Sequence, residues 1–497
     1  MCKNSFLYEI NARLFLSRMS SKYGRNLTLA TIPEEEWQSI AETGFDLVWL
    51  MGIWQRSPGA KHEAILHPDL RRRYDEVLPG WDVNDIDGSP YAVYNYTLSK
   101  NLGDNKDFDS IKKALNDKGL RFLVDFVPNH FSLDTPWLQS NPEYFVQGGG
   151  DDINKYSDWF YSADGRRYFA HGRDPHFPSW SDTVQLNYFS PEARTAMTHE
   201  LLGICDLADG VRCDMAMLVL NDIFEQVWGW LLPDFAKPRD EFWAEAISSV
   251  KKKNPEFLFI AEAYWGMEPV LLNLGFDFVY NKTLYDRLLF ASAAEVRSYL
   301  ATMPLPLTST VNFIENHDEP RAIAAFGRER SMSAAVAVAT LPGLRMFHNG
   351  QLQGKHIHLP VQVVTEPVES VDEEVQEFYL KLLKICDDSV FRDGEWKLLE
   401  SCQAWEGNDS HQNLLAWSWI YRDELKIVAV NYSSDRLQAR IKMPLILAMD
   451  GTVIYQDELT GSSYEGIADE INGIGLYVDL GPWKSHILSF CLSGTVA

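Results

Sequence analysis

The sequence predicts an α/β fold: a (β/α)8 TIM barrel with a subdomain inserted after strand 3 and a C-terminal antiparallel β-sandwich domain. Apolar strand-like runs alternate eight times with helical patterns, one connection is unusually long, and helical patterns stop near residue 388. With 497 residues, 46% of them hydrophobic, the chain can form one large barrel with appendages. We expect the barrel at residues 1–130 and 185–388, the inserted subdomain at 131–184, and the C-terminal domain at 389–497.

Eight apolar runs of strand length are expected to form the barrel. They span residues 7–16, 45–51, 121–126, 210–214, 257–261, 276–280, 310–314 and 344–347. Helical segments separate them; residues 107–118 place Phe108, Ile111 and Leu115 on one face, with Asp107 as the expected N-cap. Strands that alternate with helices form parallel sheets, and eight of them indicate a closed barrel.

The connection from His130 to Gln185 interrupts this alternation. It is rich in Gly, Asp, Pro and aromatic residues, and a loop of this length is usually a functional subdomain. After a final helix near residues 375–385, the pattern changes to short strands. These are expected at residues 414–420, 425–431, 475–480 and 487–491, which predicts a small all-β domain.

Net charge, apolar stretches and cysteine spacing limit which partners and which cellular compartment are expected for this protein. The net charge of −25 argues against nucleic acid and anionic membranes as partners and suits a neutral ligand such as a sugar, although acidity also simply aids solubility. No apolar stretch has membrane-spanning length, and the first thirty residues lack the apolar core of a secretory signal. The six cysteines are scattered without a CxxC pair, so we expect reduced, buried cysteines and a cytoplasmic protein.

Charged residues stand at the ends of four predicted strands. The segments are residues 125–130 (DFVPNH), 210–216 (GVRCDMA), 259–262 (FIAE) and 313–318 (FIENHD). Unpaired charge is costly to bury, and polar residues at the C-terminal ends of barrel strands are typical of catalysis. We therefore expect Arg212, Asp214, Glu262 and Asp318 to meet at the mouth of the barrel.

Three carboxylates and one guanidinium suggest glycoside chemistry. Cleaving a glycosidic bond requires an acid for the leaving oxygen and a carboxylate on the opposite face. Asp214, beside Arg212, would stay ionised as the nucleophile, whereas Glu262 follows an apolar run that raises its pKa, as suits the general acid. Asp318 would brace the distorted sugar. Taken singly, each segment has a structural reading, such as an ion pair or a turn; their joint appearance favours function.

At these residues the chain resembles the α-amylase family, glycoside hydrolase family 13, over nearly its entire length. The family pattern DxxxNH matches residues 125–130, GxRxDxA matches 210–216, and NHD matches 316–318. The resemblance implies Asp214 as nucleophile, Glu262 as acid/base and Asp318 as transition-state stabiliser. These are the roles expected from the residues themselves.

The resemblance also implies a substrate-binding set. Arg212, His130 and His317 would contact the sugar in the cleavage subsite, and Tyr91 would pack on the apolar face of a pyranose. Asp125, the first residue of the DxxxNH pattern, belongs to the same set.

Three departures from the family pattern bear on function. Met217 and Leu218 replace a Lys-His pair often found after the nucleophile, and they either face the acceptor side of the cleft or pack beneath it. Gln185 replaces an acid near the end of the subdomain. Asn129 stands where some members bind calcium, but the lost acid disfavours that site. We therefore expect no metal among the site residues and no required cofactor, with calcium as the disfavoured alternative to a structural hydrogen bond of Asn129.

The sequence thus predicts a retaining α-glycosidase that hydrolyses α-1,4-glucosidic bonds in α-glucans or maltooligosaccharides through a covalent glycosyl-enzyme. One alternative is an α-glucan transglycosylase (glucanotransferase) with the same site. Another is a non-catalytic glucan-binding homologue, which is disfavoured because all three acids are present. The substrate partner is an α-glucan or oligosaccharide in each case.

Overall fold

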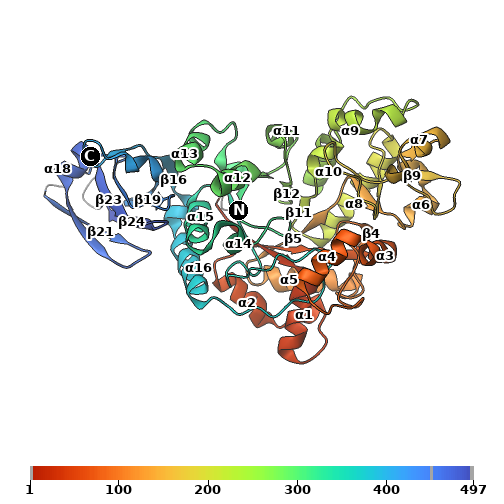
Figure 1. The fold of residues 1–497 in the computed structure, drawn as a ribbon, viewed down its shortest axis with the longest axis horizontal. Helices are drawn as coiled ribbons and strands as arrows, with labels where there is room; N and C mark the ends of the chain where they lie inside the picture. The colour runs from red at the N-terminus through yellow and green to blue at the C-terminus, as the bar shows by residue number, and fades with distance from the viewer. Residues whose placement is uncertain (1–3, 448–450, 493–497) are drawn as a thin grey trace.

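The computed structural model describes residues 4–447 and 451–492. Its centre is a closed barrel of eight parallel strands in the order β1-β15-β14-β13-β12-β11-β5-β2, which confirms the predicted barrel (Figure 1). The strands are β1 (Phe6–Asn11), β2 (Leu47–Met51), β5 (Arg121–Phe126), β11 (Gly210–Cys213), β12 (Leu258–Ala261), β13 (Phe278–Tyr280), β14 (Thr310–Asn312) and β15 (Leu344–His348).

The first strand is shorter than predicted. It ends at Asn11, and helix α1 (Ala12–Tyr23) follows at once, so residues 12–16 are helical. The Asn11 side chain accepts hydrogen bonds from the backbone N–H groups of Arg13 and Leu14. An asparagine N-cap satisfies donors that the first helical turn leaves free, and this explains the early switch.

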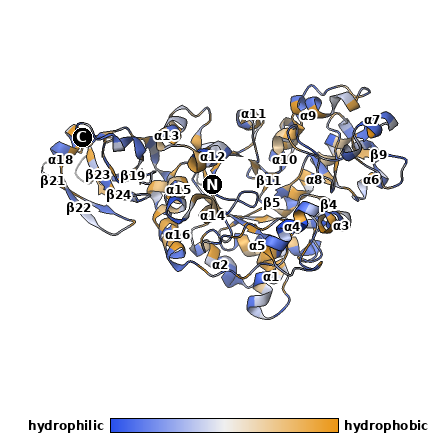
Figure 2. Ribbon diagram, viewed as in Figure 1, coloured by the Kyte–Doolittle hydropathy of each residue, from blue (hydrophilic) through white to orange (hydrophobic). Residues whose placement is uncertain are grey.

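Helices surround the barrel and show mixed bands of hydrophobic and hydrophilic residues, as expected of helices with one face on a core (Figure 2). The main ones are α2 (Glu34–Glu42), α5 (Phe108–Asn116), α8 (Pro191–Leu207), α10 (Phe242–Lys253), α12 (Lys282–Phe290), α13 (Ala293–Thr302), α15 (Arg328–Thr340) and α16 (Glu373–Cys386). Asp107 occupies the predicted N-cap position of α5, but its side chain does not cap this helix and accepts instead from the backbone N–H of Asp104.

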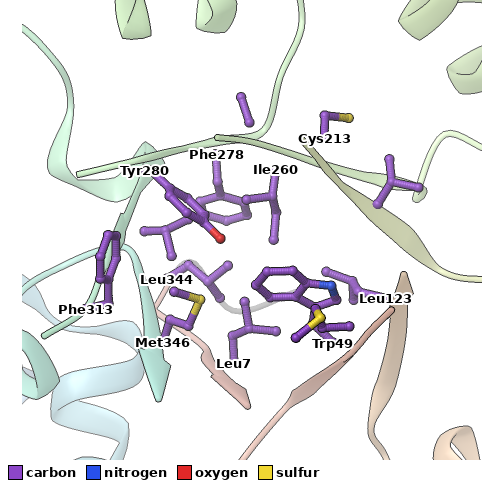
Figure 3. Close-up of a cluster of buried hydrophobic side chains, with 14 of the residues drawn as sticks. Leu7, Trp49, Leu123, Cys213, Ile260, Phe278, Tyr280, Phe313, Leu344 and Met346 are labelled. Atoms are coloured by element: carbon purple, nitrogen blue, oxygen red, sulfur yellow. The ribbon is translucent and has the colours of Figure 1, made fainter. Parts of the chain in front are cut away.

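Large apolar side chains fill the barrel interior. Figure 3 shows Leu7, Trp49, Ile260, Tyr280 and Met346 pointing toward one another from different strands. All five are almost fully buried. The barrel is therefore a packed core that supports a site at its rim, and not a pore.

The long connection after β5 forms small sheets of its own, at the right in Figure 1. Strand β6 (His130–Ser132) pairs antiparallel with β10 (Thr183–Gln185), and a three-stranded sheet has the order β7-β9-β8. Its strands are β7 (Gln147–Gly148), β8 (Phe160–Tyr161) and β9 (Tyr168–Ala170). The predicted domain boundaries at residues 130, 185 and 388 remain predictions.

A second excursion follows β2. It contains β3 (Trp54–Arg56), α3 (Pro58–Leu66), α4 (Pro68–Val77) and β4 (Val93–Leu98). Helices α3 and α4 lie beside each other near β4 (Figure 1). This excursion supplies part of the wall of the cavity described below.

The C-terminal region is antiparallel, as predicted. A six-stranded sheet has the order β16-β18-β19-β24-β21-β22 and a three-stranded sheet the order β17-β20-β23. Their strands are β16 (Glu395–Leu398), β17 (Ser401–Gln403), β18 (Leu414–Tyr421), β19 (Glu424–Asn431), β20 (Leu437–Ile441), β21 (Thr452–Asp457), β22 (Ser463–Ile467), β23 (Leu476–Leu480) and β24 (Ser485–Cys491). Trp417 and Val428 join the barrel core, whereas Ala416 and Ile427 belong to a separate core shared with the smaller sheet. Strands β18 and β19 of the larger sheet are thus covered on both faces.

The cysteine prediction is confirmed only in part. Cys205, Cys213 and Cys386 are buried, but Cys402 is half-buried and Cys491 is exposed; Cys2 lies outside the described residues. Within those residues, none of the helices combines the length and the apolar character needed to cross a membrane.

Candidate active site

A cavity of about 1210 Å³ lies at the C-terminal ends of the barrel strands. Its walls include Asp214, Glu262 and Asp318, together with Tyr91 and His130. The structure thus brings five of the eight predicted site residues onto one surface, although they come from five separate segments of the chain.

Arg212 joins two of the acids. Its Nη1 lies 2.6 Å from Asp214 Oδ1, and its Nη2 lies 2.9 Å from Glu262 Oε2. Strands β11 and β12 are paired neighbours, which sets the two carboxylates side by side. The guanidinium is 1% exposed and lies over the rings of Trp49, Tyr91 and Tyr280. This buried cation therefore holds Asp214 and Glu262 in place from the side of the barrel core.

The turn after Asp214 is strained. Met215 has a φ of 40°, a left-handed conformation that is unusual for a residue other than glycine. In this conformation its N–H donates to Glu262 Oε2 at 2.6 Å. Tyr264 donates its hydroxyl to Glu262 Oε1 at 2.7 Å. Both oxygens of Glu262 thus have a fixed donor, and the carboxyl group is held in one orientation.

Burial dominates the pKa values of the paired acids. Desolvation raises the pKa of Glu262 to about 7, although Arg212 opposes the shift. Desolvation also raises the pKa of Asp214 and outweighs the opposing effect of Arg212. The expectation that Arg212 alone sets the charge of Asp214 is therefore not met. A carboxyl with a pKa near 7 can act as a proton donor at neutral pH.

Asp318 is electrostatically different from the other two acids. Its side chain is 49% exposed, and its Oδ2 lies 3.0 Å from His317 Nε2. Partial desolvation alone would raise the pKa of Asp318, but the His317 charge outweighs it and lowers this pKa to about 2. Asp318 therefore remains ionised throughout the neutral range.

Glu9 holds His317 from the opposite side. Glu9 Oε1 accepts from His317 Nδ1 at 2.6 Å, and the Glu9 side chain is fully buried. Desolvation disfavours a charged ring, but Asp318 and Glu9 outweigh it and raise the pKa of His317 well above its usual value. The Tyr91 hydroxyl lies 2.8 Å from His317 Nε2, and the two rings stack at 5.2 Å.

Glu9 and Tyr264 were not predicted. An acid inside the first apolar strand is a signal for Glu9, because a buried charge needs a partner. Tyr264 gave no comparable signal, since an aromatic residue after a strand is most often part of a core.

Three predicted substrate-binding residues lie behind the cavity wall. Arg212 and His317 are 1% and 4% exposed and hold the acids that line the cavity. Asp125 is 1% exposed and accepts from Trp49 Nε1 and from the backbone N–H of Gly52. Burial raises the pKa of Asp125 to about 6. In this structure the three residues position their neighbours, and their contact with a sugar remains a prediction.

Asn129 and Gln185 do not fit a calcium ion. Asn129 Nδ2 donates to Gln185 Oε1 at 3.1 Å, and Gln185 Nε2 donates to Asn129 Oδ1 at 2.9 Å. Calcium requires several free oxygen ligands, including carboxylates, and this amide pair uses its oxygens internally. In the part of the chain that the structure describes, no group of three His, Cys, Asp or Glu side chains could hold a metal ion. That no cofactor is required remains a prediction.

Met217 and Leu218 do not face the acceptor side. They are 0% and 3% exposed, and neither lines the cavity. Met217 belongs to the barrel core. Both residues lie in the short helix η5 (Ala216–Val219), whose four residues are all buried. Of the two alternatives for this departure, packing beneath the cleft is the one that the structure supports.

Comparison with known proteins identifies the family. The model named "Alpha amylase, catalytic domain" matches residues 35–397, which is most of the chain. The chain therefore belongs to the α-amylase family of glycoside hydrolases and transglycosylases, and the predicted resemblance is confirmed.

Individual relatives are distant. The chain is 22% identical to "Alpha-amylase MalA" of Haloarcula japonica over 94% of its own length, but it spans only 60% of that relative. It is 23% identical to "4-alpha-glucanotransferase" of Thermotoga maritima, over 68% of this chain and 72% of the relative. The solved structure of the maltogenic α-amylase AmyB from Thermotoga neapolitana covers 98% of this chain and 99% of its own, with a TM-score of 0.70 at 20% identity, and thus shares its fold.

Proposed function

We propose that this protein is a retaining α-glycosidase that hydrolyses α-1,4-glucosidic bonds in α-glucans or maltooligosaccharides. The observation that carries the proposal is the single guanidinium of Arg212, which pairs with Asp214 and Glu262 where both face one cavity with Asp318. Family membership and relatives named as amylases support the substrate class.

The proposed reaction has two steps. The Asp214 carboxylate attacks the anomeric carbon while Glu262 gives its proton to the glycosidic oxygen, so the bond to the leaving sugar breaks and a glycosyl ester forms. Glu262, now ionised, then takes a proton from water, and the hydroxide attacks the same carbon and releases Asp214. Asp318 would bind hydroxyls of the distorted ring, and Tyr91 would pack on its apolar face.

Transfer to a sugar instead of water is the second candidate, because it uses the same ester and a named glucanotransferase is among the relatives. Two expectations from the sequence stay part of the proposal: a cytoplasmic location, from the signal and cysteine patterns, and no nucleic-acid partner, from the net charge.

Product analysis tests the proposal. The purified protein is incubated with maltooligosaccharides of three to seven units, and the anomeric protons of the products are followed by NMR. We expect new reducing ends to appear first as the α-anomer. Initial release of the β-anomer, or no reaction with any of these sugars, would overturn it.

A further inference from the structure

Two loops meet at one end of the cavity and form what we call the end wall, residues 82–89 and 359–364. Ile86 and Val363 form an antiparallel bridge, and the N–H of Asp87 donates to the carbonyl of Gln362 at 2.8 Å. Ser89 and Gln362 line the cavity. The first loop follows β2 and the second follows β15, so the end wall spans the rim above β1, which lies between these strands.

The end wall has a small hydrophobic core of its own. Ala64 and Tyr74, from α3 and α4, pack with Ile86 and Val363 in a cluster separate from the barrel core. All four side chains are at most 3% exposed. A segment with buried apolar contacts resists local opening, so the wall is a fixed part of the cavity.

The base of the wall is tightly packed. A Cβ on Gly88 would lie 2.9 Å from the carbonyl oxygen of Ser57, and one on Gly52 would lie 2.8 Å from Pro90 Cβ. The buried Arg56 donates to the carbonyl of Gly88. The backbone at Gly88 thus lies in close contact with Ser57 and Arg56, at the start of the same connection after β2.

The strand order of the barrel shows on which side of the mouth the end wall lies relative to Glu262, the proposed acid. Glu262 follows β12, which is four strands from β1 in either direction around the eight-stranded barrel. The end wall and the proposed acid are therefore on opposite sides of the mouth. Because the acid protonates the leaving oxygen, the leaving sugar lies on the Glu262 side and the retained sugar extends toward the wall.

We propose that the enzyme acts on the non-reducing ends of its substrates, because the end wall leaves no path for a chain to continue beyond the retained sugars. This inference rests on the proposed function and specifies its substrate class. The side chains of Ser89 and Gln362 would bind hydroxyls of the terminal sugar. An interior segment of a long glucan would be excluded by steric clash with the wall.

The test compares two forms of maltoheptaose, one with a free non-reducing end and one with that end blocked as a 4,6-acetal. We expect the intact enzyme to cleave the free form and to cleave the blocked form at least about 100-fold more slowly. Comparable cleavage of both would overturn the inference while leaving the proposed function intact. Cleavage of neither would refute the proposed function, and the inference with it.

A variant locates the effect at the wall. Gln362→Ala should lose about tenfold in kcat/KM on the free form, as expected for a lost hydrogen bond to the terminal sugar. Gln456→Ala, at an exposed position on β21, is the matched control and should leave kcat/KM unchanged. An unchanged kcat/KM in Gln362→Ala would contradict recognition of a chain end by the wall.

Discussion

Two buried polar clusters lie at the ends of the paired strands β5 and β11, and they differ in what they leave unsatisfied. The amide pair of Asn129 and Gln185 is neutral and is bonded internally through both of its side chains. The cluster of Arg212, Asp214 and Glu262 is charged, and its acids face a cavity. The amide pair, here called the closed pair, therefore has a structural role. The charged cluster, here called the open cluster, can still bind a ligand through the acids that face the cavity.

Neutralising the open cluster should have the largest effect. Asp214→Asn is nearly isosteric, so the fold should persist, but turnover should fall by about 10⁴–10⁶, which corresponds to about 5–8 kcal/mol. Steady-state kinetics on maltooligosaccharides, with circular dichroism for folding, would measure this. Asp234→Asn, in an exposed loop, is the control. Near wild-type turnover in purified Asp214→Asn would remove the nucleophile assignment.

Changing the acid should have a smaller and selective effect. Glu262→Gln should lose about 10²–10⁴ in rate on natural substrates, because it has no proton to give. It should remain active on glycosyl fluorides, whose leaving group needs no proton. Glu256→Gln, an exposed acid that precedes β12, serves as control. Equal losses on both substrate types would mean that Glu262 is not the acid.

The pH dependence of kcat/KM should report the protonation of Glu262 in the open cluster. The reaction needs Glu262 protonated, and its pKa is about 7, raised by desolvation. The value of kcat/KM should therefore fall about tenfold for each pH unit above 7, where the proton is lost. A pH series at fixed ionic strength measures this alkaline limb. If kcat/KM began to fall only above about pH 9, Glu262 would not be the general acid.

Opening the closed pair should affect stability and leave the chemistry unchanged. Gln185→Ala leaves the buried Asn129 oxygen without this donor, which should lower the free energy of unfolding by about 1–3 kcal/mol. Urea denaturation would measure the change, with Gln456→Ala as the exposed control. The melting temperature of the wild type should not change when EDTA is added. A large drop that calcium reverses would show that this pair is not closed.

The sequence predicted the barrel because its signals are local. Apolar runs, helical periodicity and charges at strand ends each fit within a few residues, and the positions of all eight strands followed from them. The over-long first strand shows the limit of this reading. Asn11 ends the strand by capping a helix, and the helix itself begins within the same apolar run.

The remaining features depend on contacts between distant residues. Glu9 and His317 are 308 residues apart in the chain, and no local pattern pairs them. The end wall likewise joins Ile86 to Val363. The burial of Asp125 is also set by distant contacts, because its carboxylate accepts from Trp49 Nε1 and from the backbone N–H of Gly52, more than 70 residues away in the chain.

The most direct test of the central claim is to trap the covalent intermediate. The protein is incubated with a 5-fluoro-α-glucosyl fluoride, an activated substrate whose glycosyl-enzyme hydrolyses slowly, and is then digested and mapped by mass spectrometry. The proposed mechanism predicts one fluoroglucosyl adduct, on the peptide that contains Asp214. An adduct on another residue, or steady turnover to the β-anomer with no adduct, would contradict it.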